Sequence, residues 1–110
     1  MEKCGYVYIM ASSFKRLYIG FTTELEVRVR KHKSGWYPGS FTDTYRIDKL
    51  VYYERYERIT RAIGRERELK GWLRQRKIAL IVASNPDWRD LSEDWGKPVE
   101  PFREPTPIDP

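Results

Sequence analysis

Cysteine, histidine and long apolar runs are scarce in this chain of 110 residues. Cys4 is its only cysteine, which excludes an intramolecular disulfide and a cysteine-based zinc cluster and fits a reducing compartment. The longest aliphatic stretch, residues 78–83, is far shorter than the roughly 20 residues that span a bilayer. The N-terminus lacks the basic and then apolar layout of a signal peptide. We therefore expect a soluble, cytoplasmic protein without a membrane partner.

Charge is abundant and mainly basic. The chain has 21 Lys and Arg against 16 Asp and Glu, and the excess of positive charge lies in residues 1–95. A positive net charge favours polyanionic partners such as nucleic acids, although many basic proteins bind none. Most of the prolines fall in residues 98–110. The sequence therefore predicts one globular domain over residues 1–95 and a proline-rich, extended or disordered tail over residues 96–110.

Three stretches rich in β-branched and aromatic residues predict strands, namely residues 5–11, 17–21 and 49–56. The turn-like segment 12–16 joins the first two, so we expect an antiparallel hairpin there. Residues 36–48 contain Pro38 and Gly39 among polar residues and predict a long loop.

Helices are predicted from their expected caps and stops. Thr23 and Glu26 have the spacing of a capping box, and Gly35 supplies a stop, so a first helix is expected to end near Ser34. Thr60 is expected to cap a second helix over residues 61–76. A short apolar helix is expected over residues 77–83, followed by a packed closing segment around residues 87–91. The order of elements is then β-β-α-β-α-α, an α+β fold.

Each of the two longer helices carries polar residues where apolar ones would be expected. His32 shares a face with Leu25 and Val29, and Arg28 lies one turn before it on the same side, so both can reach toward one point. Glu66 falls within the apolar row 62-66-69-73. A carboxylate on such a row is unfavourable unless it is paired or bound to a cation.

Ordinary structural roles could explain each of these residues alone. Glu66 could form an ion pair with a neighbouring arginine, and Arg28 could lie on a solvated helix face. His32 could be a histidine with satisfied hydrogen bonds at the core boundary. Tyr8 and Tyr18 could simply pack, because strands favour tyrosine.

Together the residues resemble the GIY-YIG nuclease superfamily over about residues 5–92. Tyr18-Ile19-Gly20 matches the second of the paired strand motifs literally, whereas in Tyr6-Val7-Tyr8 the first glycine and isoleucine are replaced, a form common in small stand-alone bacterial members. Arg28 lies ten residues after Tyr18, as the helix arginine does in that family. The segment from Ala62 to Trp72, with Glu66 inside it, is similar to the segment that carries the family's metal-binding glutamate.

This resemblance implies a three-stranded antiparallel sheet flanked by helices, and metal-dependent hydrolysis of phosphodiester bonds in DNA. Members include homing and restriction endonucleases and the incision subunit of bacterial nucleotide-excision repair, so a role in DNA repair is one expectation. Glu66 would hold one Mg²⁺ or Mn²⁺ and Arg28 would stabilise the phosphate. Tyr18 is the expected base, Tyr8 is its hydrogen-bonding neighbour, and His32 orients the site or shares proton transfer.

Contacts with double-stranded or branched DNA are expected from a further set of residues, although its basic members could instead form a solvated face. The set comprises Gly20, Lys31, Thr42, Lys70, Arg74, Lys77 and Asn85. The loop from Gly35 to Thr44 adds aromatic and hydroxyl groups. The main alternative is a nucleic-acid-binding module with little or no catalysis on the same scaffold, and a protein-interaction domain is a third reading. The tail could recruit a targeting protein.

Overall fold

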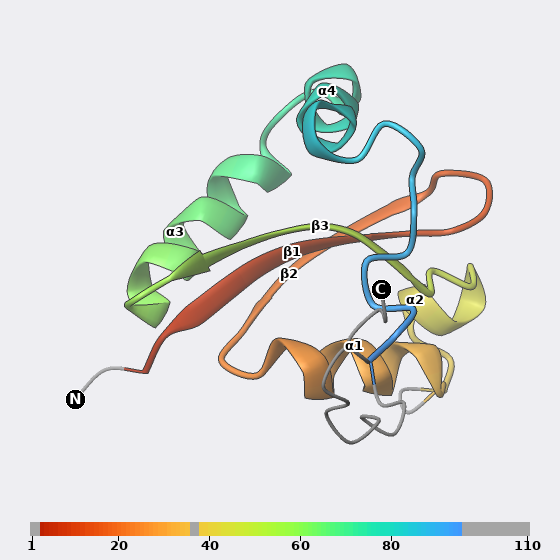
Figure 1. Cartoon of the computed structure of the whole chain (residues 1–110), viewed down its shortest axis with the longest axis horizontal. Helices are drawn as coiled ribbons and strands as arrows, with labels where there is room; N and C mark the ends of the chain where they lie inside the picture. The colour runs from red at the N-terminus through yellow and green to blue at the C-terminus, as the bar shows by residue number, and fades with distance from the viewer. Residues whose placement is uncertain (1–2, 36–37, 96–110) are drawn as a thin grey trace, which may run out of the picture.

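A three-stranded antiparallel sheet forms the centre of the computed structural model, which describes residues 3–35 and 38–95. Its strands are β1 (Gly5–Ala11), β2 (Leu17–Thr22) and β3 (Lys49–Tyr56), in the order β2-β1-β3 (Figure 1). The first and third predicted strands are confirmed at both ends, and the second is one residue longer than expected. The α+β fold and the order of its principal elements are as predicted.

The hairpin between β1 and β2 is closed by the serine at its start. The backbone N–H of Ser12 donates to the carbonyl of Arg16 at 3.0 Å, and the Ser12 hydroxyl accepts from the amides of Phe14 and Arg16. This turn sets the register in which Tyr8 lies opposite Gly20.

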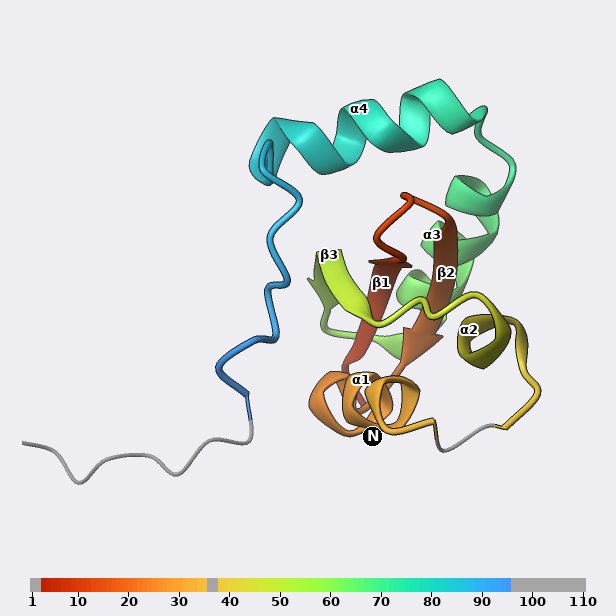
Figure 2. The same cartoon turned by 90° about the vertical axis from the view of Figure 1, so that its right-hand side faces the viewer.

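Alternate residues of β1 face two different helical layers, because successive side chains of a strand point to opposite faces. Tyr8 and Met10 pack with Leu25 and Val29 of helix α1 (Leu25–Lys33). The other side of the sheet packs against helices α3 (Ile59–Lys70) and α4 (Arg74–Ser84) through a separate cluster of Val7, Ile9, Ala11, Ile19, Val51, Leu69 and Ile81. Figures 1 and 2 both show α1 below the sheet and α4 above it.

The predicted start of the first helix is wrong. Glu24, not Thr23, is the N-cap of α1, and no side chain caps the helix. The hydroxyl of Thr22, at the end of β2, accepts the Glu24 amide at 3.0 Å, and this turn holds residues 22–24 outside the helix. The predicted end is confirmed, since Ser34 is the C-cap and Gly35 follows with φ of +69°.

The second predicted helix is too long, and Thr60 does not cap it. Helix α3 has Arg58 as its N-cap and ends at Lys70, and α4 begins at Arg74. Gly71, a poor helix former, ends α3 and donates its amide back to the carbonyls of Arg67 and Glu68. Leu73 therefore lies outside the core row and is 80% exposed.

The segment predicted as one long loop contains a single helical turn, α2 (Phe41–Thr44). The Ser40 hydroxyl caps it by accepting from the amide of Asp43 at 3.2 Å. Figure 2 shows α2 beside α1, beyond the β2 side of the sheet. Trp36 and Tyr37 of the predicted loop, and the predicted tail over residues 96–110, lie outside the described residues.

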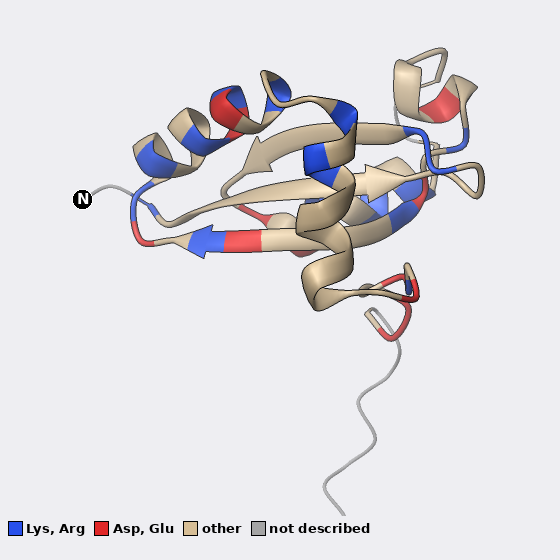
Figure 3. Cartoon of the chain, turned by 90° about the horizontal axis from the view of Figure 1, so that it is seen from above, with Lys and Arg blue, Asp and Glu red and all other residues tan. Residues whose placement is uncertain are grey.

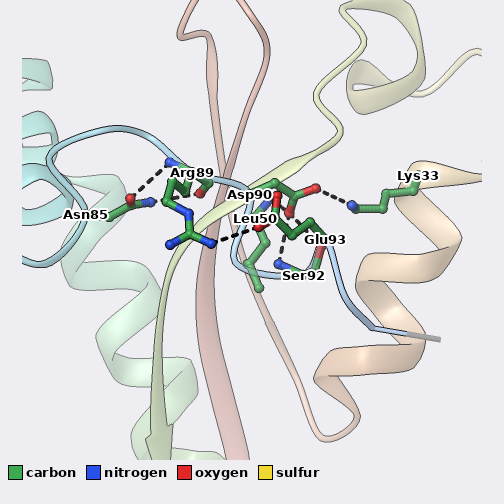
Figure 4. Close-up of polar contacts among 7 residues, drawn as sticks. All are labelled: Lys33, Leu50, Asn85, Arg89, Asp90, Ser92 and Glu93. Carbon is green, nitrogen blue, oxygen red and sulfur yellow. Dashed lines mark hydrogen bonds and ion pairs between the residues drawn. The ribbon is translucent and has the colours of Figure 1, made fainter. Parts of the chain in front are cut away.

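The packed closing segment is confirmed, and two side chains fix it along the edge of β3 (Figure 4). Asn85 donates to the carbonyls of Val51 at 3.0 Å and Arg89 at 2.9 Å, and accepts from the Arg89 amide. Asp90 accepts from the Leu50 amide at 3.2 Å and from Lys33 of α1. None of the helices among the described residues has the length and hydropathy of a membrane span.

Candidate active site

A chain of hydrogen bonds joins β1, α1 and α2 on the α1 side of the sheet. The phenolic oxygen of Tyr8 lies 3.1 Å from Nε2 of His32, and Nδ1 of His32 lies 3.1 Å from Oγ1 of Thr42. Oγ1 of Thr42 lies 3.2 Å from Oγ of Ser40. Tyr8, His32 and Thr42 are all buried. Side chains from distant parts of the sequence thus form one connected polar network.

Tyr18 joins this network through its ring. Its ring centroid lies 5.3 Å from that of His32 and 6.3 Å from that of Tyr8. The two tyrosines share a face because Tyr8 pairs with Gly20, two residues from Tyr18 along β2. Unlike Tyr8, Tyr18 is partly exposed. The structure therefore brings both predicted strand tyrosines to the predicted histidine.

Gly20 provides the space in which the Tyr8 phenol lies. A Cβ atom at position 20 would be 2.6 Å from the Tyr8 hydroxyl and 2.7 Å from its Cζ. Contacts this short are not tolerated without movement of the ring. The glycine of the second motif is thus needed for packing against the tyrosine of the first.

An open hollow of about 380 Å³ lies beside the network. It is lined by Tyr18, Arg28, His32, Ser40, Phe41 and Thr42. Arg28 comes from the middle of α1 and is partly exposed. Within the described residues, no hydrogen bond or ion pair holds its guanidinium group, so the group is available to an anion that enters the hollow.

His32 is neutral around pH 7. Burial, and to a smaller extent the positive charge of Arg28, together lower the pKa of its imidazole to about 4. A neutral imidazole has one nitrogen that donates a hydrogen bond and one that accepts. This fits its position between two hydroxyl groups.

Glu66 lies on α3, in the row of buried residues Ala62, Glu66 and Leu69. It is 8% exposed, and its carboxylate is 3.3 Å from Nζ of the exposed Lys70. Its ion pair is thus with a lysine rather than an arginine. Helix α3 covers the opposite face of the sheet from α1, and among the described residues no hydrogen bond or ion pair joins Glu66 to Tyr8, Tyr18, Arg28 or His32.

The acidic donors fit a loosely held divalent cation rather than a closed metal site. Across residues 3–35 and 38–95, no group of three or more His, Cys, Asp or Glu side chains is placed to hold a metal ion. Glu66 supplies one buried carboxylate whose only ion pair in this part of the chain is with Lys70. Mg²⁺ and Mn²⁺ commonly bind through one or two carboxylates together with water and substrate oxygens.

The residues predicted to contact nucleic acid fall into different environments. Gly20 and Thr42 belong to the network itself, and Lys70 pairs with Glu66. Arg74 donates to the carbonyl of Lys15 at 2.6 Å. Lys31 and Lys77 are partly exposed. Figure 3 shows basic residues on α3 and at the start of α4, with acidic residues among them on α3.

Asn85 differs from the rest of that set. It is 5% exposed, and its amide group is engaged with backbone atoms of Val51 and Arg89. The structure gives this side chain a structural role in fixing the closing segment.

The sequence did not indicate that Ser40 belongs to the network, nor that the Thr42 hydroxyl is hydrogen-bonded to His32. Both depend on α2, which was predicted as loop. Ser40 and Asp43 have the spacing of a helix cap, and that signal was present in the sequence.

Comparisons with known proteins show the family of this chain. The model of the GIY-YIG catalytic domain matches residues 4–79. A UPF0213 protein of Syntrophus aciditrophicus is 38% identical over 83 residues, which cover 76% of this chain and 94% of that protein. A UPF0213 protein of Staphylococcus aureus is 40% identical over 76 residues, covering 69% of this chain and 92% of that protein.

A solved structure extends the likeness to the fold. The solution structure of a UPF0213 protein from Bacillus halodurans matches with a TM-score of 0.52 and 25% identity, over 84% of this chain and 97% of that chain. The family model spans both strand motifs, α1 and the glutamate-bearing helix α3. These matches show that the chain belongs to the GIY-YIG catalytic domain family, whose tyrosine and arginine motifs lie around the hollow.

Proposed function

We propose that this protein is a metal-dependent endonuclease that hydrolyses phosphodiester bonds in DNA. The observation that carries the proposal is the hollow in which Tyr18, Arg28 and His32 meet. A GIY-YIG catalytic domain implies a nucleic-acid substrate, and the hollow offers a cation, a phenol and a neutral imidazole to one phosphate.

Arg28 would stabilise the phosphate. Its guanidinium carries a permanent charge and a planar fork of donors that fits phosphoryl oxygens. Within the described residues it has no competing carboxylate partner. A preorganised donor of this kind typically contributes a factor of roughly 10²–10³ to the rate.

Tyr18 would take the proton from the attacking water. Tyr18 lines the hollow and is partly exposed, whereas Tyr8 is fully buried behind Gly20. A base must come within hydrogen-bond reach of the proton it removes, which favours Tyr18 over Tyr8. Tyr8 and His32, whose rings lie beside that of Tyr18, would then hold Tyr18 in position.

Glu66 would hold the divalent cation, Mg²⁺ or Mn²⁺, from the α3 side of the sheet. A cation of this kind stabilises the charge that develops on phosphoryl oxygens and lowers the pKa of bound water. Glu66 suits the role because it is a buried carboxylate whose ion pair in the described part of the chain is with the exposed Lys70 alone.

A nucleic-acid-binding module with weak or absent catalysis is the second candidate. The observation that favours it is the position of Glu66, on a helix that covers the other face of the sheet from the hollow. Basic side chains such as Arg74 and Lys77 could bind a phosphate backbone without any cation at Glu66.

The experiment is a cleavage assay with supercoiled, branched and single-stranded DNA in Mg²⁺ or Mn²⁺. The test variants are Glu66→Ala and Arg28→Ala. Glu68→Ala and Arg30→Ala are matched controls, because each removes an exposed residue of the same type from the same helix. Metal-dependent nicking that survives in the controls and is lost in both test variants supports the endonuclease. DNA binding without cleavage in every protein supports the binding module instead.

A further inference from the structure

The network beside the hollow has a direction that follows from the chemistry of its hydroxyl groups. His32 has a hydroxyl partner at each ring nitrogen, Tyr8 at Nε2 and Thr42 at Nδ1, both at 3.1 Å. A neutral imidazole can accept from one of them and must donate to the other. Two arrangements therefore compete, and they differ in the nitrogen that carries the proton.

The acidity of Tyr8 favours one of them, provided that Thr42 supplies an acceptor for the proton on Nδ1. The phenol of Tyr8 is far more acidic than an aliphatic hydroxyl, with a reference pKa of about 10. It is therefore the better donor to the single lone pair of the imidazole. Tyr8 then donates to Nε2, and the Nδ1–H group of His32 donates to Thr42.

The capping arrangement of α2 agrees with this direction. Once Oγ1 of Thr42 accepts from His32, its own hydroxyl proton is free to donate to Oγ of Ser40, 3.2 Å away. Ser40 accepts the Asp43 amide as the cap of α2 with one lone pair, and its second lone pair can accept the Thr42 proton. The tautomer of His32 thus depends on the cap of α2 as well as on the hydrogen bond to Tyr8.

We propose that Thr42 is a positioning residue that fixes His32 in the Nδ1–H tautomer, so that Tyr8 donates its phenolic proton to Nε2. This inference rests on the proposed function for its meaning in catalysis. The tautomer itself can be measured without any cleavage.

The sequence makes the measurement simple, because His32 is the only histidine. Long-range ¹H–¹⁵N correlation spectra of the ¹⁵N-labelled protein at neutral pH report which ring nitrogen carries the proton. The wild type is expected to show the Nδ1–H form. In Thr42→Val, which keeps the shape but removes the hydroxyl, the spectrum is expected to change to the Nε2–H form, because the imidazole then donates to Tyr8.

Two further variants make the result specific. Thr42→Ser restores a hydroxyl and is expected to restore the Nδ1–H form, whereas Thr44→Val alters an exposed threonine two residues on and is expected to leave the wild-type spectrum unchanged. An Nε2–H tautomer in the wild type overturns the proposal, and so does an Nδ1–H tautomer that persists in Thr42→Val. If Thr42→Val does not fold, the wild-type spectrum and the Thr42→Ser spectrum still decide.

The cleavage assay separates this inference from the proposed function. Thr42→Val is expected to lower kcat by roughly tenfold to a hundredfold with little change in KM, and Thr42→Ser to recover most of it. A wild type that shows the Nδ1–H tautomer and never cleaves DNA would leave the positioning role intact and refute the endonuclease. Unchanged kcat in a Thr42→Val protein whose tautomer has changed would refute the role of the tautomer in catalysis.

Discussion

Gly20 and the phenol of Tyr8 are packed so closely that a methyl group at position 20 would lie 2.6 Å from the Tyr8 hydroxyl. The two residues pair across β1 and β2, and the phenol is fully buried and bonded to His32. The glycine and the first tyrosine of the two motifs therefore act as one packing unit.

Gly20→Ala is expected to lower the free energy of unfolding by about 2 kcal/mol, because the ring of Tyr8 must leave its position. Gly64→Ala is a control in the middle of α3, where an added Cβ meets nothing within 4 Å. It is expected to raise stability by about 1 kcal/mol through helix propensity. Urea denaturation of the three proteins checks both values, and equal stability of Gly20→Ala and wild type would contradict the packing argument.

Acidification is expected to destabilise the protein through His32. Its pKa in the folded state is about 4, below the value near 6.5 in an unfolded chain, so the unfolded state binds a proton first as the pH falls. The stability that the neutral imidazole provides is complete above pH 6.5 and is lost as the pH falls toward 4. Between pH 7 and pH 4.5 the loss from this residue is about 2 kcal/mol.

Comparison with His32→Gln isolates that contribution, since the carboxylates titrate in both proteins. Urea denaturation at several pH values is expected to show a steeper acid loss in the wild type than in the variant. Parallel pH profiles would show that His32 does not titrate with a lowered pKa.

Asn85→Ala is expected to act on stability and not on DNA binding. It removes the side chain that holds the Val51 and Arg89 backbone, which leaves buried polar groups unpaired and costs about 2 kcal/mol. Thermal denaturation and DNA affinity measured well below the melting temperature distinguish the two roles. An unchanged melting temperature together with a weakened affinity for DNA would show that Asn85 contacts nucleic acid instead.

The partly buried carboxylate of Glu54 and the buried carboxylate of Glu66 are expected to differ in what their removal costs. Glu54 accepts from Arg65 at 3.0 Å and from two tyrosine hydroxyls, so Glu54→Ala breaks a paired network and is expected to cost about 2 kcal/mol. Glu66 has only Lys70 as an ion-pair partner within the described residues, so Glu66→Ala is expected to leave the metal-free melting temperature nearly unchanged. A large decrease for Glu66→Ala would identify Glu66 as a structural residue.

Local pattern predicted the strands well and the helix boundaries less well. The alternation of apolar and aromatic residues located β1 and β3 to the residue. The predicted start of α1 was wrong because the turn at the end of β2 depends on tertiary structure. There the hydroxyl of Thr22 accepts the Glu24 amide, and the helix begins at Leu25. The break at Gly71 was overlooked because the apolar row seemed to continue to Leu73, which the structure exposes.

The sequence predicted which residues belong to the site, but not how they lie relative to one another. The resemblance to the GIY-YIG motifs indicated Tyr8, Tyr18 and Arg28, and helix periodicity placed His32 on the same side as Arg28. The burial of Glu66 was also predicted and is confirmed. Its position relative to the tyrosines was not predictable, because that depends on how α3 packs on the sheet rather than on any local pattern.

In the proposed endonuclease, a cation held by Glu66 would form one site with Tyr18, Arg28 and His32. Mn²⁺ broadens the NMR signals of nuclei close to it, and the single histidine gives an unambiguous probe. Titrating Mn²⁺ into the protein with bound DNA is expected to broaden the ring signals of His32 in the wild type and in Glu68→Ala, but not in Glu66→Ala. Sharp His32 signals in the wild type, or equal broadening in Glu66→Ala, would contradict the claim.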